Sequence, residues 1–208
     1  EAKSAHAEYL VLWVRDGDFA YYNSSILPKA PGLTGKDPLR DAVKEARYIG
    51  MPLLAYCVVQ QAGHFLKAHP EFEMIGANRQ RIGRFCFNSG YLEAIKQIVE
   101  EQLDYGIDGF HIDMVDQGFG PPYGCYCDTC RKLFENKYKH VMPRSVSWDS
   151  SWHDFLQFRY WTSAHFEQEL YKYIKSVNPR ATVDFNYHGN PPFSFEVGQL
   201  PVMHAVNA

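Results

Sequence analysis

Four of the five cysteines in this 208-residue chain are spaced like the ligands of one metal ion. Cys125, Cys127 and Cys130 form a C-x-C-x-x-C cluster, and Cys86 lies upstream of it. Four thiolates at short, flexible spacings can surround a tetrahedral Zn²⁺ ion and leave no position for water, which makes such a site structural. We therefore predict a structural zinc ion and no organic cofactor. The alternative is free thiols or a disulfide, and Cys57, inside an apolar run, is expected to be a core residue.

An aspartate ends the short segment 109–113, which the sequence predicts to be a strand. In a barrel of parallel strands, an acid at the carboxyl end of a strand lies in the cleft where catalytic groups gather. A carboxylate there can attack the anomeric carbon of a sugar or orient a water molecule, so we predict that Asp113 is catalytic. Asp116 is the nearest second carboxylate and the predicted partner. The alternative is a structural acid that caps the following loop.

Aromatic and polar side chains at or just past the ends of the predicted strands could bind a sugar. Aromatic rings suit the apolar C–H faces of a sugar, and polar tips suit its hydroxyl groups. His111 alternates with Asp113 along its strand, so both should face the same side. His111 could bind a hydroxyl group or a metal, or be a core histidine, and each of the others could instead pack a loop. The predicted substrate-binding residues are Trp13, Tyr22, Tyr56, His64, His111, Tyr123, Asn186 and His188.

The pattern of apolar residues predicts the elements that would position these groups. Continuous apolar runs predict buried strands at 9–14 and 52–59, the first of them covered on both faces, and shorter runs predict strands at 109–113 and 181–186. Apolar stripes and capping residues predict the helices. These run from Pro38 to Gly50, from Ser89 to Gly106, and over about 129–140 and 152–177. The arginine-rich stretch 78–84 is expected to be a solvated loop.

Strands that alternate with helices are typical of parallel βα units. An α/β fold of the (β/α)₈ TIM-barrel type is favoured over a doubly wound sheet, because no glycine-rich phosphate-binding signature follows any strand. Eight strands typically need ~250 residues, and four are found here. We therefore predict an incomplete portion of a barrel, about four to five βα units. The chain is expected to be truncated at the C-terminus, and the missing initiating Met points to truncation at the N-terminus as well.

The composition excludes several classes of protein. The chain carries 24 acidic and 21 basic residues, a net charge of −3, which argues against a nucleic-acid-binding protein with a basic face. No apolar run reaches the ~18 residues of a membrane span. A hydrophobic fraction of 46% excludes a disordered chain. No secretory signal is visible, so reduced cysteines favour the cytoplasm without fixing the location, and the oligomeric state does not follow from the sequence.

Several short motifs, in this order and spacing, resemble the hypothetical glycosyl hydrolase 6 family. They are Tyr21-Tyr22-Asn23-Ser24, Pro31-Gly32-Leu33, Asp37-Pro38-Leu39, Ala55-Tyr56, His69-Pro70-Glu71-Phe72, Cys86-Phe87-Asn88-Ser89 with Tyr91, and Asp108-Gly109-Phe110-His111-Ile112-Asp113. The resemblance runs from about residue 9 to residue 188. It implies that residues 1–208 are a glycoside hydrolase-like TIM-barrel catalytic domain with a carbohydrate substrate.

The cysteine pattern is similar to the zinc cluster of family 42 β-galactosidases. In that family one cysteine of a C-P-N-S stretch joins a later C-x-C-x-x-C, a pattern that maps onto Cys86, Cys125, Cys127 and Cys130. Those enzymes carry an Asn-Glu acid/base pair where this chain reads Asp113-Met114-Val115-Asp116, so their mechanism does not carry over. An aspartate nucleophile at this strand end is similar to that of α-L-fucosidases, which is an analogy between folds.

The leading hypothesis is a retaining glycosidase with Asp113 as nucleophile. Its acid/base would be Asp116, Glu196 or a residue beyond the end of the chain. One rival hypothesis is a carbohydrate-binding or scaffold barrel without turnover. The other is a metal-dependent hydrolase that uses His111 and Asp113 as ligands.

Overall fold

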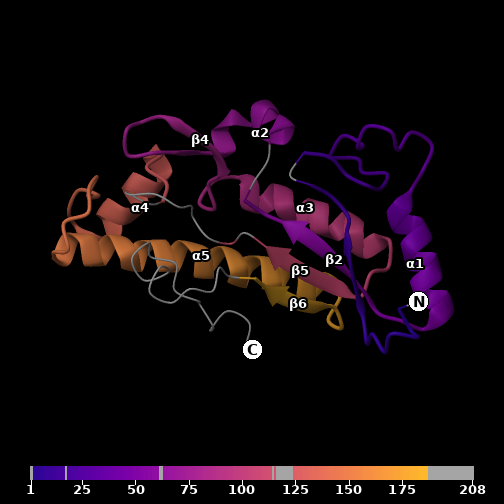
Figure 1. Cartoon of the computed structure of the whole chain (residues 1–208). Helices are drawn as coiled ribbons and strands as arrows, with labels where there is room; N and C mark the ends of the chain where they lie inside the picture. The colour runs from indigo at the N-terminus through magenta and orange to yellow at the C-terminus, as the bar shows by residue number, and fades with distance from the viewer. Residues whose placement is uncertain (1, 17, 61–62, 114, 116–123, 187–208) are drawn as a thin grey trace.

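The computed structural model describes residues 2–16, 18–60, 63–113, 115 and 124–186. Its main feature is a four-stranded parallel sheet in the order β1-β2-β5-β6 (Figure 1). The strands are Leu10–Trp13 (β1), Leu53–Val58 (β2), Gly109–Asp113 (β5) and Thr182–Phe185 (β6). Each lies within a segment that the apolar pattern predicts as a strand, so the predicted parallel βα arrangement is confirmed.

Helices connect the strands of this sheet. They are α1 (Pro38–Ile49), α3 (Tyr91–Asp104), α4 (Asp128–Tyr138) and α5 (Ser150–Val177). The Asp37 carboxylate accepts a hydrogen bond from the Arg40 N–H at 3.2 Å, which caps α1, and Gly50 ends the helix in the left-handed conformation with φ 64°. The start of α3 differs slightly from the prediction. Ser89 accepts from the Tyr91 N–H at 3.2 Å, but Gly90 occupies the cap position.

One face of the sheet packs against α1, α3 and α5 and forms the main core (Figure 1). Alternate residues of each strand point to this face, because side chains alternate sides along a strand. The core combines Leu53, Ala55, Cys57, Phe110, Ile112 and Val183 of the sheet with Leu39 and Val43 of α1, Ile95, Ile98 and Val99 of α3, and Phe166, Leu170 and Ile174 of α5. The expectation that Cys57 is a core residue is met, since its side chain has no exposed surface. The opposite face of the strands is left for the polar residues described below.

The apolar run of the first strand predicts cover on both faces, whereas in the described part of the chain β1 is covered on one face. Val11 is 44% exposed and Trp13 is 48% exposed. Within the described sheet β1 pairs with β2 alone and is therefore an edge strand. An apolar run shows that a strand can be buried, but it does not show how many neighbours cover it.

The segment after β2 contains structure that the sequence does not predict. A short helix α2 (His64–Ala68) and a 3₁₀ turn (Pro70–Phe72) lead into an antiparallel pair, β3 (Glu73–Ile75) and β4 (Arg81–Phe85). The prediction of a loop over 78–84 is therefore wrong from Arg81 onward. The first three residues of β4 are all exposed, so this strand lacks the alternation that marks a half-buried strand.

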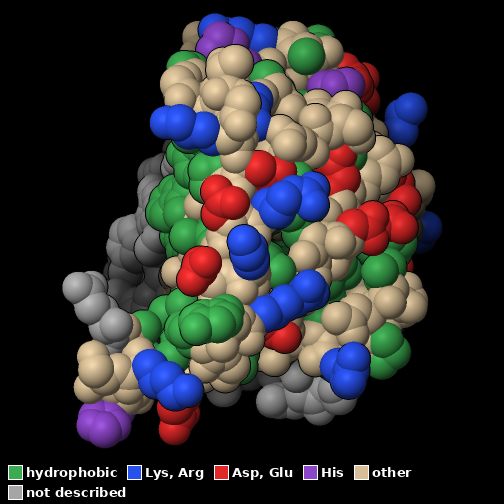
Figure 2. All heavy atoms as spheres, turned by 90° about the vertical axis from the view of Figure 1, so that its right-hand side faces the viewer, with side chains coloured by type: hydrophobic (Ala, Val, Ile, Leu, Met, Phe, Trp, Pro, Cys, Tyr) green, Lys and Arg blue, Asp and Glu red, His purple; other side chains and the backbone are tan. Residues whose placement is uncertain are grey.

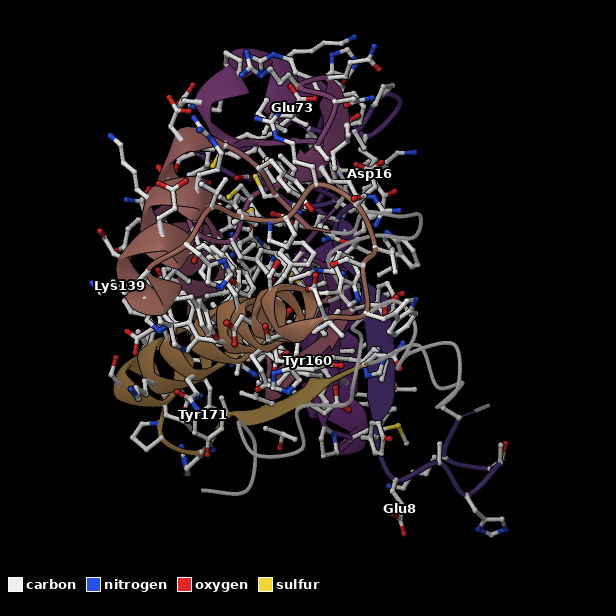
Figure 3. All side chains as sticks on the ribbon, turned by 90° about the vertical axis from the view of Figure 1, so that its left-hand side faces the viewer. Glu8, Asp16, Glu73, Lys139, Tyr160 and Tyr171 are labelled. Carbon is white, nitrogen blue, oxygen red and sulfur yellow. The ribbon has the colours of Figure 1, made fainter. Side chains whose placement is uncertain are left out.

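A second apolar cluster lies around the cysteines. We call this region, made of β3, β4, α4 and the N-terminal half of α5, the cysteine lobe. Its buried residues are Met74, Cys86, Cys125, Tyr126, Cys130, Phe134, Met142, Trp152, Phe155, Leu156 and Phe158. Cys86 directly follows β4 and Cys130 lies in the first turn of α4, and Figure 3 shows the strand pair that carries Glu73 above the helix that ends near Lys139.

The charged surface agrees with the near-neutral composition. On the face seen in Figure 2, Lys and Arg side chains are interspersed with Asp and Glu side chains. Within the described part of the chain, no helix is both long enough and apolar enough to cross a bilayer.

Candidate active site and cysteine centre

The face of the sheet turned away from the main core carries a row of four side chains, one from each strand. Trp13 pairs with Tyr56, Tyr56 with His111, and His111 with Asp184. The rings of Trp13 and Tyr56 stack with centroids 4.4 Å apart, and those of Tyr56 and His111 with centroids 5.4 Å apart. The row ends in a contact of 2.8 Å between His111 Nδ1 and Asp184 Oδ1. We call these four residues the aromatic row.

Asp113 lies on the same face as the row, two residues beyond His111 on β5. Its side chain is largely buried, with 9% exposed. The Tyr56 hydroxyl donates a hydrogen bond to Oδ2, and the Asn186 side-chain amide donates to Oδ1 at 2.8 Å. Asn186 is held in turn by its backbone N–H, which donates to the Ile112 carbonyl at 2.7 Å. Both carboxylate oxygens are thus oriented by neutral donors from the two neighbouring strands.

The proton on Tyr56 is held firmly. Partial burial, the hydrogen bond to Asp113 and the negative charge of that carboxylate raise the pKa of Tyr56 to about 12. The phenol therefore keeps its proton at neutral pH and stays a hydrogen-bond donor to Asp113.

The other predicted substrate residues are not all brought to this place. His64, the first residue of α2, lies by the loop after β1, where its ring is 5.3 Å from that of Phe19 and its backbone N–H donates to Asp18 at 2.5 Å. The predicted residues Asp116, Tyr123, His188 and Glu196 lie outside the described residues.

Tyr22 occupies the core and not the open face. Its side chain has no exposed surface, and its hydroxyl donates to the Glu101 carboxylate of α3 at 3.2 Å. Ser24 and Ser25 donate to the same carboxylate. Burial raises the pKa of Tyr22 well above its usual range. The structure thus gives this motif an anchoring role, in which it ties the loop after β1 to α3, in place of the predicted contact with a substrate.

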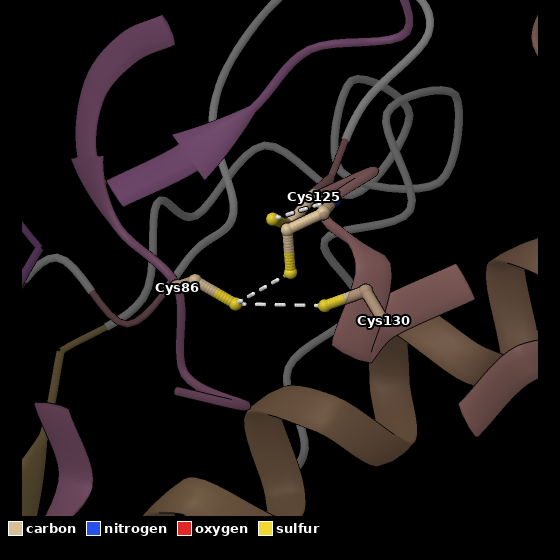
Figure 4. A group of neighbouring side chains, drawn as sticks. Cys86, Cys125 and Cys130 are labelled. Carbon is tan, nitrogen blue, oxygen red and sulfur yellow. Dashed lines mark hydrogen bonds between the residues drawn. The ribbon is translucent and has the colours of Figure 1, made fainter. Parts of the chain in front are cut away.

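The four predicted metal ligands meet in the cysteine lobe (Figure 4). Their Sγ atoms all lie within 4.8 Å of one another, with Cys86 3.5 Å from Cys130 and 3.9 Å from Cys127. A tetrahedral site with Zn–S bonds of ~2.3 Å separates its sulfur atoms by about 3.8 Å. All five cysteines are described, and each is a free thiol. The geometry therefore suits a metal ion and not a disulfide.

Hydrogen-bond donors surround the sulfur atoms. The Ile75 N–H donates to Cys125 at 3.4 Å, and the Asn88 side-chain amide donates to Cys130 at 3.3 Å. Hydrogen bonds from the other three cysteines lower the pKa of Cys127 far below its usual range, whereas hydrogen bonds with Cys125 and Cys127 raise the pKa of Cys86 and of Cys130. Sulfur atoms this close cannot all be charged without a cation between them. The four-cysteine cluster could bind a metal such as zinc.

Sequence reasoning missed one polar residue of the row. Asp184 lies on β6 two residues before Asn186, and the period of two along a strand places both on one face. That spacing was the available signal. Among the residues that the structure describes, the four cysteines are the one group of three or more His, Cys, Asp or Glu side chains placed to hold a metal ion, and His111 and Asp113 do not belong to such a group.

Comparison with families of known sequence gives one match. Residues 1–114 match the family described as hypothetical glycosyl hydrolase 6. A search of curated proteins found no match.

Several solved structures share the fold. An α-L-fucosidase isoenzyme 2 from Paenibacillus thiaminolyticus superposes with a TM-score of 0.69 at 20% identity, over 89% of this chain and 28% of its own. The GH42 β-galactosidase Gan42B from G. stearothermophilus gives 0.65 at 16%, over 91% and 32%. A β-galactosidase from the Antarctic haloarchaeon Halorubrum lacusprofundi gives 0.66 at 17%, over 94% and 35%.

This chain thus spans about a third of the length of the solved structures that it matches. At these identities the likeness concerns the fold alone. It confirms the predicted architecture, a parallel α/β sheet that corresponds to part of a (β/α)₈ barrel.

Proposed function

The chain belongs to the hypothetical glycosyl hydrolase 6 family, and from this premise we propose that residues 1–208 are part of a glycoside hydrolase domain that cleaves a carbohydrate glycosidic bond. The observation that carries the proposal is the Asp113 carboxylate. It lies at the carboxyl end of β5, almost buried, and each of its oxygens accepts a hydrogen bond from a neighbouring strand. Catalytic groups of barrel enzymes lie at this end of the strands.

In the proposed mechanism Asp113 is the nucleophile of a retaining reaction. One carboxylate oxygen bonds to the anomeric carbon as the bond to the leaving oxygen breaks, and a general acid protonates that oxygen. Water then attacks the anomeric carbon and breaks its bond to Asp113. The residue that acted as general acid now acts as base and accepts the proton of that water. Asp116 and Glu196 are the candidates for this acid/base. Tyr56 and Asn186 hold the carboxylate in one orientation, which favours attack from a fixed direction.

The aromatic row supplies the proposed sugar subsite. Trp13 is about half exposed, and one face of its ring stacks on Tyr56, so the other face could pack against the C–H face of a sugar. His111 lies next in the row and offers a polar group to a hydroxyl. This subsite would serve a carbohydrate-binding barrel equally well, which makes a module without turnover the second candidate.

We propose that the cysteine cluster holds a structural zinc ion. Four sulfur ligands close the coordination sphere and leave no open position for a substrate. Cys125 lies on the chain segment that connects β5 to α4, and Cys86 directly follows β4. A metal held by both would fix the beginning of α4 and the end of β4 relative to each other.

The test of the nucleophile is a screen of aryl glycosides with the full-length gene product, followed by Asp113→Ala. Loss of a nucleophile should lower the rate at least about a thousandfold, or ~4 kcal/mol of transition-state stabilisation. Added azide should restore turnover and give a glycosyl azide of inverted anomeric configuration, because azide fills the space of the carboxylate and attacks the anomeric carbon.

Asp104→Ala, at the exposed end of α3, is the matched control and should keep full activity. An Asp113→Ala variant that hydrolysed its glycoside at the wild-type rate would refute the assignment. Sugar binding by a wild-type protein that cleaves no glycoside would favour the binding module.

A further inference from the structure

The aromatic row ends in a histidine–aspartate pair, and the proposed function gives no role to its aspartate. We propose that Asp184 is a positioning residue that keeps the proton of the His111 ring on Nδ1. Nε2 then carries the lone pair and can accept a hydrogen bond from a hydroxyl group of the carbohydrate. This inference rests on the proposed function, since it assumes that a sugar occupies the aromatic row.

The position of the pair follows from the strand register. His111 on β5 pairs directly with Asp184 on β6, so both side chains lie on the same face of the sheet. Nδ1 and Oδ1 are 2.8 Å apart, the length of a good hydrogen bond. Within the chain described here, the His111 side chain is 28% exposed and that of Asp184 is 52% exposed.

The orientation of the imidazole is fixed from the other side as well. The Tyr56 ring stacks on the His111 ring with an angle of 25° between the planes, and Trp13 stacks on Tyr56. The Tyr56 hydroxyl is already committed to Asp113. Stacking on one side and a carboxylate on the other leave the imidazole little freedom to turn.

The chemistry of the pair decides which nitrogen carries the proton. An ionised carboxylate only accepts hydrogen bonds, so the ring nitrogen beside it must be the donor. A neutral imidazole has one N–H, and the partner of one nitrogen sets the state of the other. With the proton on Nδ1, the lone pair is on Nε2. A sugar hydroxyl can donate to this nitrogen, whereas a ligand that lacks a hydrogen atom at that position loses the bond.

The chain contains a similar pair that serves as a control. His140 Nε2 lies 2.9 Å from Asp154 Oδ2 in the cysteine lobe, away from the aromatic row. Both side chains are about one-third exposed. Removing the Asp154 carboxylate therefore repeats the same chemical change at a place where the proposal expects no effect on a ligand.

The experiment reads the ring nitrogens of His111 by NMR in the full-length protein with ¹⁵N-labelled histidine. At about pH 8.5 an ordinary imidazole is neutral, so the tautomer can be read directly. The wild type should show the Nδ1–H form. Asp184→Asn is isosteric but can donate as well as accept, so it should give a mixture of both forms. Asp184→Glu should restore the Nδ1–H form, because it restores a group that only accepts.

Asp154→Asn should leave the His111 signals unchanged. An Nε2–H tautomer in the wild type, or an unchanged tautomer in Asp184→Asn, would overturn the inference. A merely structural role for Asp184 would change the melting temperature of the variants but not the tautomer.

The second arm titrates the same proteins with L-fucose and with D-galactose. The affinity of the sugar that binds should fall about twofold in Asp184→Asn, because an equal mixture of tautomers halves the fraction of the protein in which Nε2 accepts, and it should return in Asp184→Glu. Equal affinity in wild type and Asp184→Asn would contradict the role of Nε2. If neither sugar bound the wild type and no glycoside were cleaved, the carbohydrate site and the role of Nε2 would both fail. The tautomer measurement would still decide the role of Asp184.

Discussion

The parallel sheet and the cysteine lobe hold their polar groups in different ways. In the sheet, Asp113 is oriented by donors from the strands on either side, and the strands are fixed by a large apolar core on the other face. In the cysteine lobe, four sulfur atoms lie at the centre of a smaller apolar cluster between short elements. The sheet region should therefore be stable by packing alone, and the lobe should depend on what the sulfur atoms bind.

Removing the proposed zinc ion should have the largest effect, and this effect should be confined to the lobe. Chelation would remove the ion that holds the sulfur atoms together, and Cys86→Ala would remove the ligand that follows β4. Either change would break the connection between β4 and α4. We expect amide exchange in α4 to accelerate at least about a thousandfold, or ~4 kcal/mol, because metal binding contributes directly to folding in such sites. Amides of β2 and β5 should keep their protection. Cys57→Ala, which alters a cysteine outside the cluster, is the control. Equal loss of protection in both regions would show that they are not independent.

A pair of phenylalanine truncations should separate the two apolar clusters. Phe166 of α5 lies in the main core, stacked on Phe87 with centroids 4.0 Å apart, and Phe134 of α4 lies in the lobe. Both phenylalanine side chains are fully buried. Truncation of such a ring to alanine typically lowers stability by about 3–5 kcal/mol, and we expect a similar local cost at the two positions. Phe166→Ala should lower the global free energy of unfolding, measured with denaturant. Phe134→Ala should mainly accelerate amide hydrogen exchange in the cysteine lobe. This acceleration should be smaller when zinc is present. If Phe134→Ala lowered the global free energy of unfolding as much as Phe166→Ala does, the two apolar clusters would not be independent.

The smallest effect concerns the hydrogen bond between Tyr56 and Asp113. Because the pKa of Tyr56 is raised in the folded protein, its contribution to stability is complete below the ordinary tyrosine value of ~10 and is lost as the pH rises towards about 12. Difference absorbance between wild type and Tyr56→Phe isolates this tyrosine from the others. Asp113→Asn should lower the pKa of Tyr56, since it removes the negative charge. An unchanged titration in Asp113→Asn would mean that burial alone raises this pKa.

The sequence predicts the parallel sheet well because β1 and β2 lie in continuous apolar runs and its helices carry strong end signals, such as Asp37 before α1 and Gly50 after it. The cysteine cluster is predictable for a different reason, since the spacing of Cys125, Cys127 and Cys130 is specific for a metal site. The β3–β4 pair was missed because Arg81, Ile82 and Gly83 are all exposed, so no alternation marks the strand.

The errors at the candidate site have a common physical origin. A tyrosine near a strand end can point to either face, and the sequence does not say which. Tyr56 faces the aromatic row, whereas Tyr22 is buried against α3 and donates to Glu101. The two-residue spacing to Asn186 places Asp184 on the face of the site, but its pairing with His111, on a different strand, follows only from the register.

Tyr56 belongs to two systems at once, since its ring lies between Trp13 and His111 and its hydroxyl donates to Asp113. In the proposed enzyme, sugar preference and chemical reactivity would therefore share one side chain. A change at Trp13 or His111 that alters which sugar is preferred would also tilt the phenol and disturb the nucleophile. Directed evolution of a new specificity here would have to restore the lost rate by compensating substitutions around Tyr56, so preference and turnover would evolve together.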